Sequence, residues 1–118
     1  ACAAANANLA IWREEPVLER VAALGARQQE HLDGLSGHAM VRNARRCGTI
    51  AALELGDPDG SYLSDLGPRL LRRFRDADLL LRPLGNTVYV MPPYCIDEPD
   101  LARIWAEIAS AAEDLAAE

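Results

Sequence analysis

The spacing of hydrophobic residues predicts helices in the first third of the chain. Leu9 and Trp12 lie three residues apart on an alanine-rich background, and Pro16 is expected to end that helix or start the next. Residues 17–32 then carry apolar side chains at helical spacing. The predicted apolar face consists of Val17, Leu18, Val21, Leu24 and Leu32. Gly34 and Gly37 punctuate the loop that should follow.

Two further helices are predicted later in the chain. Pro68 can open a helix with an apolar face of Leu70, Leu71 and Phe74. The C-terminal pattern is the clearest, because Asp97 is a good N-cap and Pro99 suits a first turn. Its apolar stripe comprises Leu101, Ile104, Trp105, Ile108, Ala112 and Leu115.

Strand periodicity appears in two other stretches. Between residues 40 and 55, alternate positions from Thr49 to Leu55 form a mostly apolar face, and Cys47-Gly48 is expected to mark a bend or bulge. Residues 56–68 read as a loop by composition. In residues 79–91, a leucine run, a Gly85-Asn86 turn and a second apolar run predict a hairpin that Pro92-Pro93 ends.

The predicted order of elements is therefore helices, two strand segments, a helix, two strands and a helix. This order indicates an α+β fold, with a small antiparallel or mixed sheet of three to four strands and helices packed mainly on one face. The length fits a single domain over residues 1–118, with a helical lead-in at 1–33 and an α+β core at 40–118.

Composition narrows the possible partners. A net charge of −6 with scattered basic residues argues against nucleic acid. No apolar run approaches the roughly 20 residues of a membrane helix, so no membrane partner is expected. The cysteines Cys2, Cys47 and Cys95 are odd in number and lack CxxC spacing, which disfavours a disulfide framework or a zinc site and fits a cytoplasmic protein.

All twelve basic residues are arginine, so the chain contains no lysine. Chemistry that requires an amine side chain to form a Schiff base cannot be completed by this polypeptide alone.

Arg82 and Tyr89 are the best candidates for a binding site. In a tight hairpin around Gly85-Asn86 they would lie near each other, and a guanidinium with a phenol can bind a carboxylate. The alternative is a rim arginine whose stem packs on the strand, beside a half-buried tyrosine. The arginines within residues 69–75 read as the solvated face of a helix, with binding of an acidic partner as the alternative. Those within residues 42–46 read as an exposed strand face or a hinge near Gly48. Cys47 and Cys95 read as packing residues.

Three segments together resemble the C-terminal part of the adenosylmethionine-8-amino-7-oxononanoate aminotransferases, which are class III, fold type I enzymes dependent on pyridoxal 5'-phosphate (PLP). ACAAANANLAI resembles a helix of that family, RRCGTIAALEL its small-domain strand pair, and LRPLGNTVYVMPPY its substrate-side hairpin. They occur in the family order and span nearly the whole chain. Leu84 stands where relatives carry a phenylalanine.

The resemblance implies a transaminase of biotin biosynthesis that moves an amino group from S-adenosylmethionine to 8-amino-7-oxononanoate. Arg82 would bind the carboxylate of this keto acid, and Tyr89 would lie in the same pocket. The Schiff-base lysine and most PLP contacts would belong to a large domain preceding Ala1, in a homodimeric enzyme. The isolated chain is then expected to be inactive.

Two other hypotheses remain open. The chain could be an autonomous carboxylate-binding module, or a small interaction domain whose apolar faces pack on another subunit. The family interpretation carries a corollary, because a domain cut from its partner exposes former interface. The first helix, in which the sequence begins without a methionine, is therefore expected to be loosely packed or to mediate self-association.

Overall fold

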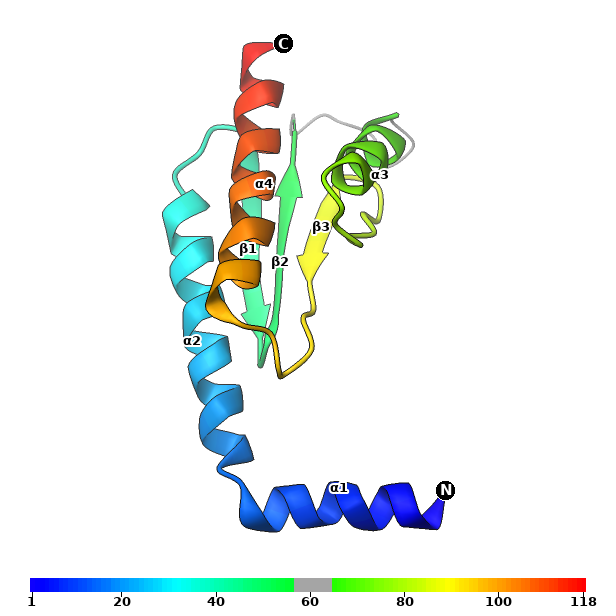
Figure 1. Cartoon of the computed structure of the whole chain (residues 1–118). Coiled ribbons are helices and arrows are strands. Elements are labelled where there is room, and N and C mark those ends of the chain that lie inside the picture. Colours follow the sequence, from blue (N-terminus) through cyan, green and yellow to red (C-terminus); the bar gives the residue numbers. More distant parts are fainter. Residues whose placement is uncertain (57–64) are drawn as a thin grey trace.

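A computed structural model describes residues 1–56 and 65–118, and this part of the chain forms helices beside a three-stranded sheet (Figure 1). In chain order the elements are α1 (Cys2–Glu14), α2 (Val17–Leu35), β1 (Val41–Cys47), β2 (Ile50–Leu55), α3 (Leu66–Asp76), β3 (Thr87–Val90) and α4 (Glu98–Ala117). The predicted α+β fold is confirmed.

The sheet is antiparallel throughout, with the order β1-β2-β3. β1 and β2 form a hairpin in which Cys47 pairs with Ile50 across a turn at Gly48, so the expected bend is present there. The bulge lies elsewhere, since the register shifts between Arg42 and Arg45, where Asn43 has a positive φ of 48°. β3 pairs with the other side of β2 and forms the second edge of the sheet.

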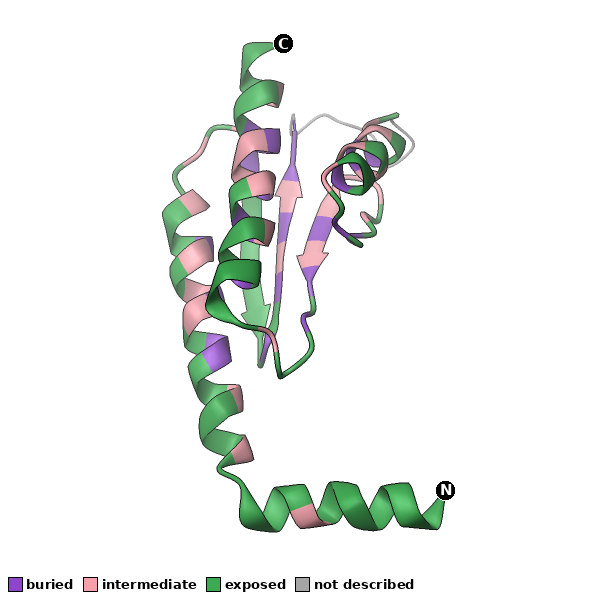
Figure 2. Ribbon diagram, viewed as in Figure 1, coloured by how far each residue is buried: buried purple, intermediate pink, exposed green. Residues whose placement is uncertain are grey.

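One face of the sheet forms the core, and helices α2, α3 and α4 lie on that face (Figures 1 and 2). β2 and β3 alternate as predicted, with Leu53 opposite Val88 and both about 1% exposed, whereas only Val41 of β1 is buried. Helices α2, α3 and α4 complete the core with Leu24, Leu32, Leu70, Phe74, Leu101, Trp105 and Ile108. The opposite face of the sheet carries residues such as Ala52, Glu54 and Tyr89, which are only half-buried.

The predicted helix boundaries agree with the structure at the start of α4 but differ at the start of α3 and the end of α2. The Asp97 side chain accepts a hydrogen bond from the backbone N–H of Asp100 at 2.9 Å, so it caps α4 as predicted. α3 begins at Leu66, two residues before the expected start at Pro68. Most of the predicted loop at residues 56–68 lies outside the described residues. α2 runs through Gly34 to Leu35, so the loop begins later than expected.

The hairpin prediction is wrong in one respect. Leu79–Pro83 forms no strand, and only an isolated bridge joins Leu84 to Thr87. Pro83 has no N–H to donate, and Asp78, at a φ of 56°, turns the chain after α3. The side chains of the segment nevertheless alternate between buried Leu79 and Leu81 and exposed Leu80 and Arg82.

Three side chains predicted to pack against other residues lie at the surface instead. Leu18 is 72% exposed because it points away from the face of α2 that carries Leu24 and Leu32. Cys47 and Cys95 are free thiols and exposed, at the end of β1 and in the segment before α4. They are therefore not packing residues.

α1 projects away from the rest of the molecule (Figure 1). All of its residues are described, and none of them is buried. Leu9, Ile11 and Trp12 are each about half exposed. This agrees with the expected loose packing of the first helix.

Across residues 1–56 and 65–118, no helix has the length and apolar character needed to cross a membrane.

Candidate functional site

The turn that precedes β3 positions Arg82 and Tyr89. Leu84 and Thr87 exchange backbone hydrogen bonds of 2.9 and 3.0 Å around Gly85 and Asn86. Gly85 has a φ of 60°, which a two-residue hairpin turn requires at its first central position and which glycine adopts without strain. The chain therefore reverses tightly here, with Arg82 before the turn and Tyr89 after it.

Arg82 and Tyr89 line the same open pocket, of about 420 Å³, at the β3 edge of the sheet. Met91, Pro93 and Ile104 contribute apolar wall to it. The other lining residues are Leu79, Leu80, Leu81, Val90, Pro92 and Ile96. A guanidinium and a phenol in an otherwise apolar pocket suit a ligand that has one anionic end and an aliphatic body.

The charge of Arg82 is available to such a ligand. Its side chain is exposed, and within residues 1–56 and 65–118 no carboxylate forms an ion pair with it. Tyr89 is half-buried and lies directly opposite Ala52, on the face of the sheet away from the core. Its ring is therefore not enclosed by the core and can contact a ligand in the pocket at the β3 edge.

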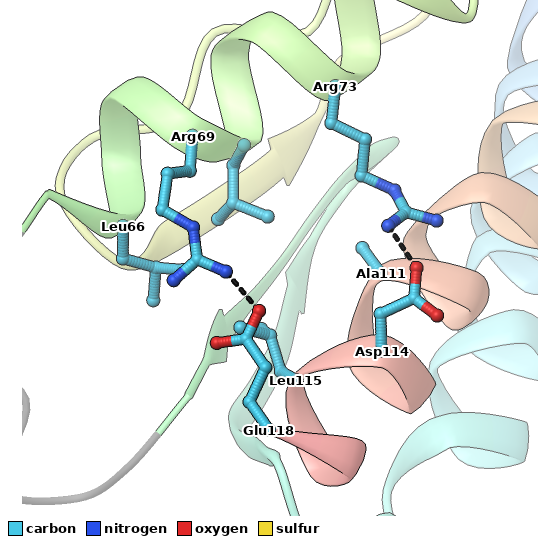
Figure 3. A pocket seen from close by; sticks show the side chains of 8 residues that line it. Leu66, Arg69, Arg73, Ala111, Asp114, Leu115 and Glu118 are labelled. Carbon is cyan, nitrogen blue, oxygen red and sulfur yellow. Dashed lines mark hydrogen bonds and ion pairs between the residues drawn. The ribbon is translucent and has the colours of Figure 1, made fainter.

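A second pocket, of about 140 Å³, lies between α3 and α4, and its arginines already have partners (Figure 3). Arg69 pairs with Glu118, and Arg73 pairs with Asp114. Arg73 also donates to Glu107 at 2.6 Å and to the Ser110 hydroxyl at 2.8 Å.

These contacts hold the two guanidinium groups in their charged form. The hydrogen bond to Glu118 raises the pKa of Arg69, and that to Asp114 raises the pKa of Arg73. The expected solvated face of α3 is thus only partly present, because Arg72 and Arg75 are exposed whereas Arg69 and Arg73 join two helices. We interpret this pocket as a structural junction.

Within residues 1–56 and 65–118, no three His, Cys, Asp or Glu side chains lie so that they could hold a metal ion together. His31 stacks on Trp105, with ring centroids 5.5 Å apart. His38 accepts a hydrogen bond from the backbone N–H of Met40 at 3.2 Å.

Sequence reasoning missed most of the apolar pocket wall and one buried polar residue. The MPPY segment after a strand is a usable signal, because consecutive prolines leave a strand and cannot pair with a neighbour. Ile104 was predicted as a core residue of the last helix. It is half-buried, packs against the core and also lines the pocket. Gln28 gave no signal, since a glutamine in a helix is ordinarily exposed.

The family model for class III aminotransferases matches residues 1–112. Among curated proteins, the adenosylmethionine-8-amino-7-oxononanoate aminotransferase of Synechococcus elongatus is 38% identical over 117 residues, which cover 97% of this chain and 26% of the relative. The enzyme of the same name from Helicobacter pylori is 33% identical, covering 98% of this chain and 27% of the relative.

Relatives with other names are also similar. The putrescine–pyruvate aminotransferase of Pseudomonas aeruginosa is 37% identical, over 88% of this chain and 24% of that protein. The crystal structure of an omega transaminase from Pseudomonas jessenii in complex with PMP superposes with a TM-score of 0.77 at 30% identity, over 92% of this chain and 25% of that one. The chain thus spans about a quarter of the length of its relatives.

Proposed function

Because this chain belongs to the class III aminotransferases, we propose that it supplies the substrate-carboxylate site of a transaminase of biotin biosynthesis. The amino donor would be S-adenosylmethionine and the acceptor 8-amino-7-oxononanoate, as the names of the two relatives from S. elongatus and H. pylori suggest. The observation that carries the proposal is the position of Arg82 in the apolar pocket that Tyr89 also lines.

In this proposal the Arg82 guanidinium donates two parallel hydrogen bonds to the far carboxylate of the keto acid. The Tyr89 hydroxyl donates a further hydrogen bond, and the apolar wall at Met91, Pro93 and Ile104 contacts the aliphatic chain. Fixing the far end of a long substrate limits the positions of its reacting carbonyl, which lowers the entropic cost of reaction.

Complete enzymes of this family depend on PLP. The residues of this chain do not fit that cofactor by themselves, since the sequence has no lysine to bind it covalently. We propose that a large domain supplies that lysine, that the working enzyme is a cytoplasmic homodimer, and that the isolated chain does not transaminate.

Binding to the isolated chain tests the carboxylate site. In an NMR titration with 8-amino-7-oxononanoate, we expect Arg82→Ala to weaken binding about tenfold or more, since a charged hydrogen-bonding group is lost. Arg82→Lys should retain part of the affinity. Arg75→Ala, which removes an exposed arginine of α3 away from the pocket, is the matched control. Equal affinity of Arg82→Ala and Arg75→Ala would refute the assigned site.

Substrate choice is tested in the polypeptide encoded by the complete reading frame. Sequencing the gene upstream of the Ala1 codon should reveal a lysine-bearing cofactor domain. The purified product should convert 8-amino-7-oxononanoate with S-adenosylmethionine in preference to putrescine with pyruvate. The reverse preference would exclude the biotin assignment, and a start codon close to Ala1 would favour the autonomous binding module.

A further inference from the structure

Gln28 is a fully buried amide that joins four parts of the fold. Its side chain, on α2, is 0% exposed. Its Nε2 donates to the Thr49 carbonyl at 3.0 Å and to the Val90 carbonyl at 3.4 Å. Its Oε1 accepts a hydrogen bond of 2.7 Å from the Trp105 indole on α4, and His31 stacks on the ring of that indole.

The hydrogen-bonding partners fix the orientation of this amide. Reversing it would place its oxygen against two carbonyl oxygens and its NH₂ against the Trp105 N–H, which accepts nothing. In the observed orientation both N–H groups and the oxygen have partners. A buried polar group with all its hydrogen bonds made tends to specify one arrangement of its neighbours.

Of the two residues whose carbonyls Gln28 binds, Val90 lines the pocket and Thr49 does not. Thr49 lies in the turn between β1 and β2. Val90 is the last residue of β3, and Met91, Pro92 and Pro93 follow it directly in the pocket wall. Neither proline has a backbone N–H, so this stretch has few means of holding its own position.

The wall is therefore anchored at its two ends. Gln28 binds the carbonyl immediately before it, and the backbone N–H of Ile96 donates to the Pro93 carbonyl at 3.0 Å on its far side. From this geometry we infer that Gln28 is a positioning residue for the Arg82 pocket. It holds the end of β3 and thereby sets where Met91–Pro93 lies; its effect on ligand binding rests on the function proposed above.

The Gln28→Met substitution tests this inference, because methionine has a similar length and offers no amide. In ¹⁵N-labelled full chain we expect the amide signals of Met91, Tyr94 and Cys95 to shift, while those of α3 keep their positions. Ile108→Val is the matched control, since it trims a side chain that is 0% exposed and lies outside this network. Its effect on the Met91–Cys95 signals should be several times smaller.

Unchanged Met91–Cys95 signals in Gln28→Met, or equal shifts in both variants, would overturn the inference. If Gln28→Met does not fold, Gln28→Asn serves instead, because it keeps an amide in the core but shortens its reach to the Val90 carbonyl.

Titration with octanoate, which combines a carboxylate with an aliphatic chain, separates this inference from the proposed function. We expect Gln28→Met to bind octanoate about five- to tenfold more weakly than Ile108→Val. If the wild-type chain fails to bind octanoate, that result counts against the carboxylate site. The amide signal shifts of Gln28→Met would still test whether Gln28 positions Met91–Pro93. Equal affinities of the two variants would overturn that role.

Discussion

At the scale of single residues, the candidate site depends on a close approach between α3 and the turn before β3. A Cβ atom added at Gly67 would lie 2.9 Å from the Gly85 carbonyl oxygen and 3.4 Å from its Cα. Both atoms belong to the backbone, so no side-chain rotation can relieve the contact. The absence of a side chain at Gly67 therefore lets α3 support the turn that places Arg82.

We predict that Gly67→Ala lowers the free energy of unfolding by about 1–3 kcal/mol, as overpacked sites do. Urea unfolding would measure this change, and the amide signals of Gly85 and Asn86 should move with it. Gly34→Ala is the control, because nothing lies within 4 Å of an added Cβ at this position in α2. It should stabilise the chain by about 0.5–1 kcal/mol through helix propensity. A Gly67→Ala variant with an unchanged free energy of unfolding would contradict the close contact.

At the scale of elements, the junction of α3 and α4 depends on Arg73. It donates to two carboxylates and a hydroxyl of α4, whereas Arg72, the preceding residue of the same helix, is exposed. Ion pairs at a surface contribute little, but one guanidinium shared by several acceptors in a half-buried position contributes more.

We therefore expect Arg73→Met to cost about 1–2 kcal/mol of stability and Arg72→Met to stay within about 0.5 kcal/mol of wild type. Thermal or urea unfolding in low and high salt would measure the stability of both variants, and high salt should reduce the difference in stability between them. The hydrogen bond to Asp114 raises the pKa of Arg73 in the folded state. The contribution of Arg73 to the free energy of unfolding is therefore complete at any pH below its unfolded-state pKa, and it is lost only when alkaline pH rises through the folded-state pKa. Equal losses in both variants would contradict the junction.

Sequence patterns predicted the elements best where one face is buried. The alternation in β2 and the stripe in α4 follow directly from contact with the core. The side chains of Leu79–Arg82 also alternate between buried and exposed, but this segment forms no strand, because Pro83 has no N–H to donate and Asp78 turns the chain at a positive φ that the sequence does not signal. The pocket was only half predictable for a related reason, because Arg82 and Tyr89 share one hairpin whereas Ile104 and Gln28 reach the region from distant helices.

At the scale of the whole molecule, the protein is more extended than its length requires. The radius of gyration is 16.4 Å, whereas a compact domain of this size is expected to have about 13.5 Å. The difference agrees with the projection of α1, which the structure describes completely and which contributes no buried residue. A single helix of this length is marginally stable in water without tertiary contacts.

We predict that the amides of α1 exchange with solvent far faster than those of α4, and that deleting residues 1–15 leaves the free energy of unfolding of the remainder within about 0.5 kcal/mol. Hydrogen exchange with mass spectrometry measures the first and urea unfolding the second. Exchange in α1 that slows with protein concentration would instead show that copies associate through this helix. Strong protection in a monomer would contradict the prediction.

The two-residue turn at Gly85-Asn86 also limits how this site can change during evolution. Leu84 and Thr87 are bridged directly, so inserting a single residue would lengthen this turn and displace Arg82 relative to β3, whose register is set by its pairing with β2. Arg82 and Tyr89 would then no longer keep their present relative positions in the pocket. Descendants with new ligand preferences should therefore differ by substitutions in the pocket wall, at positions such as Met91 and Ile104, while the length of this loop stays constant.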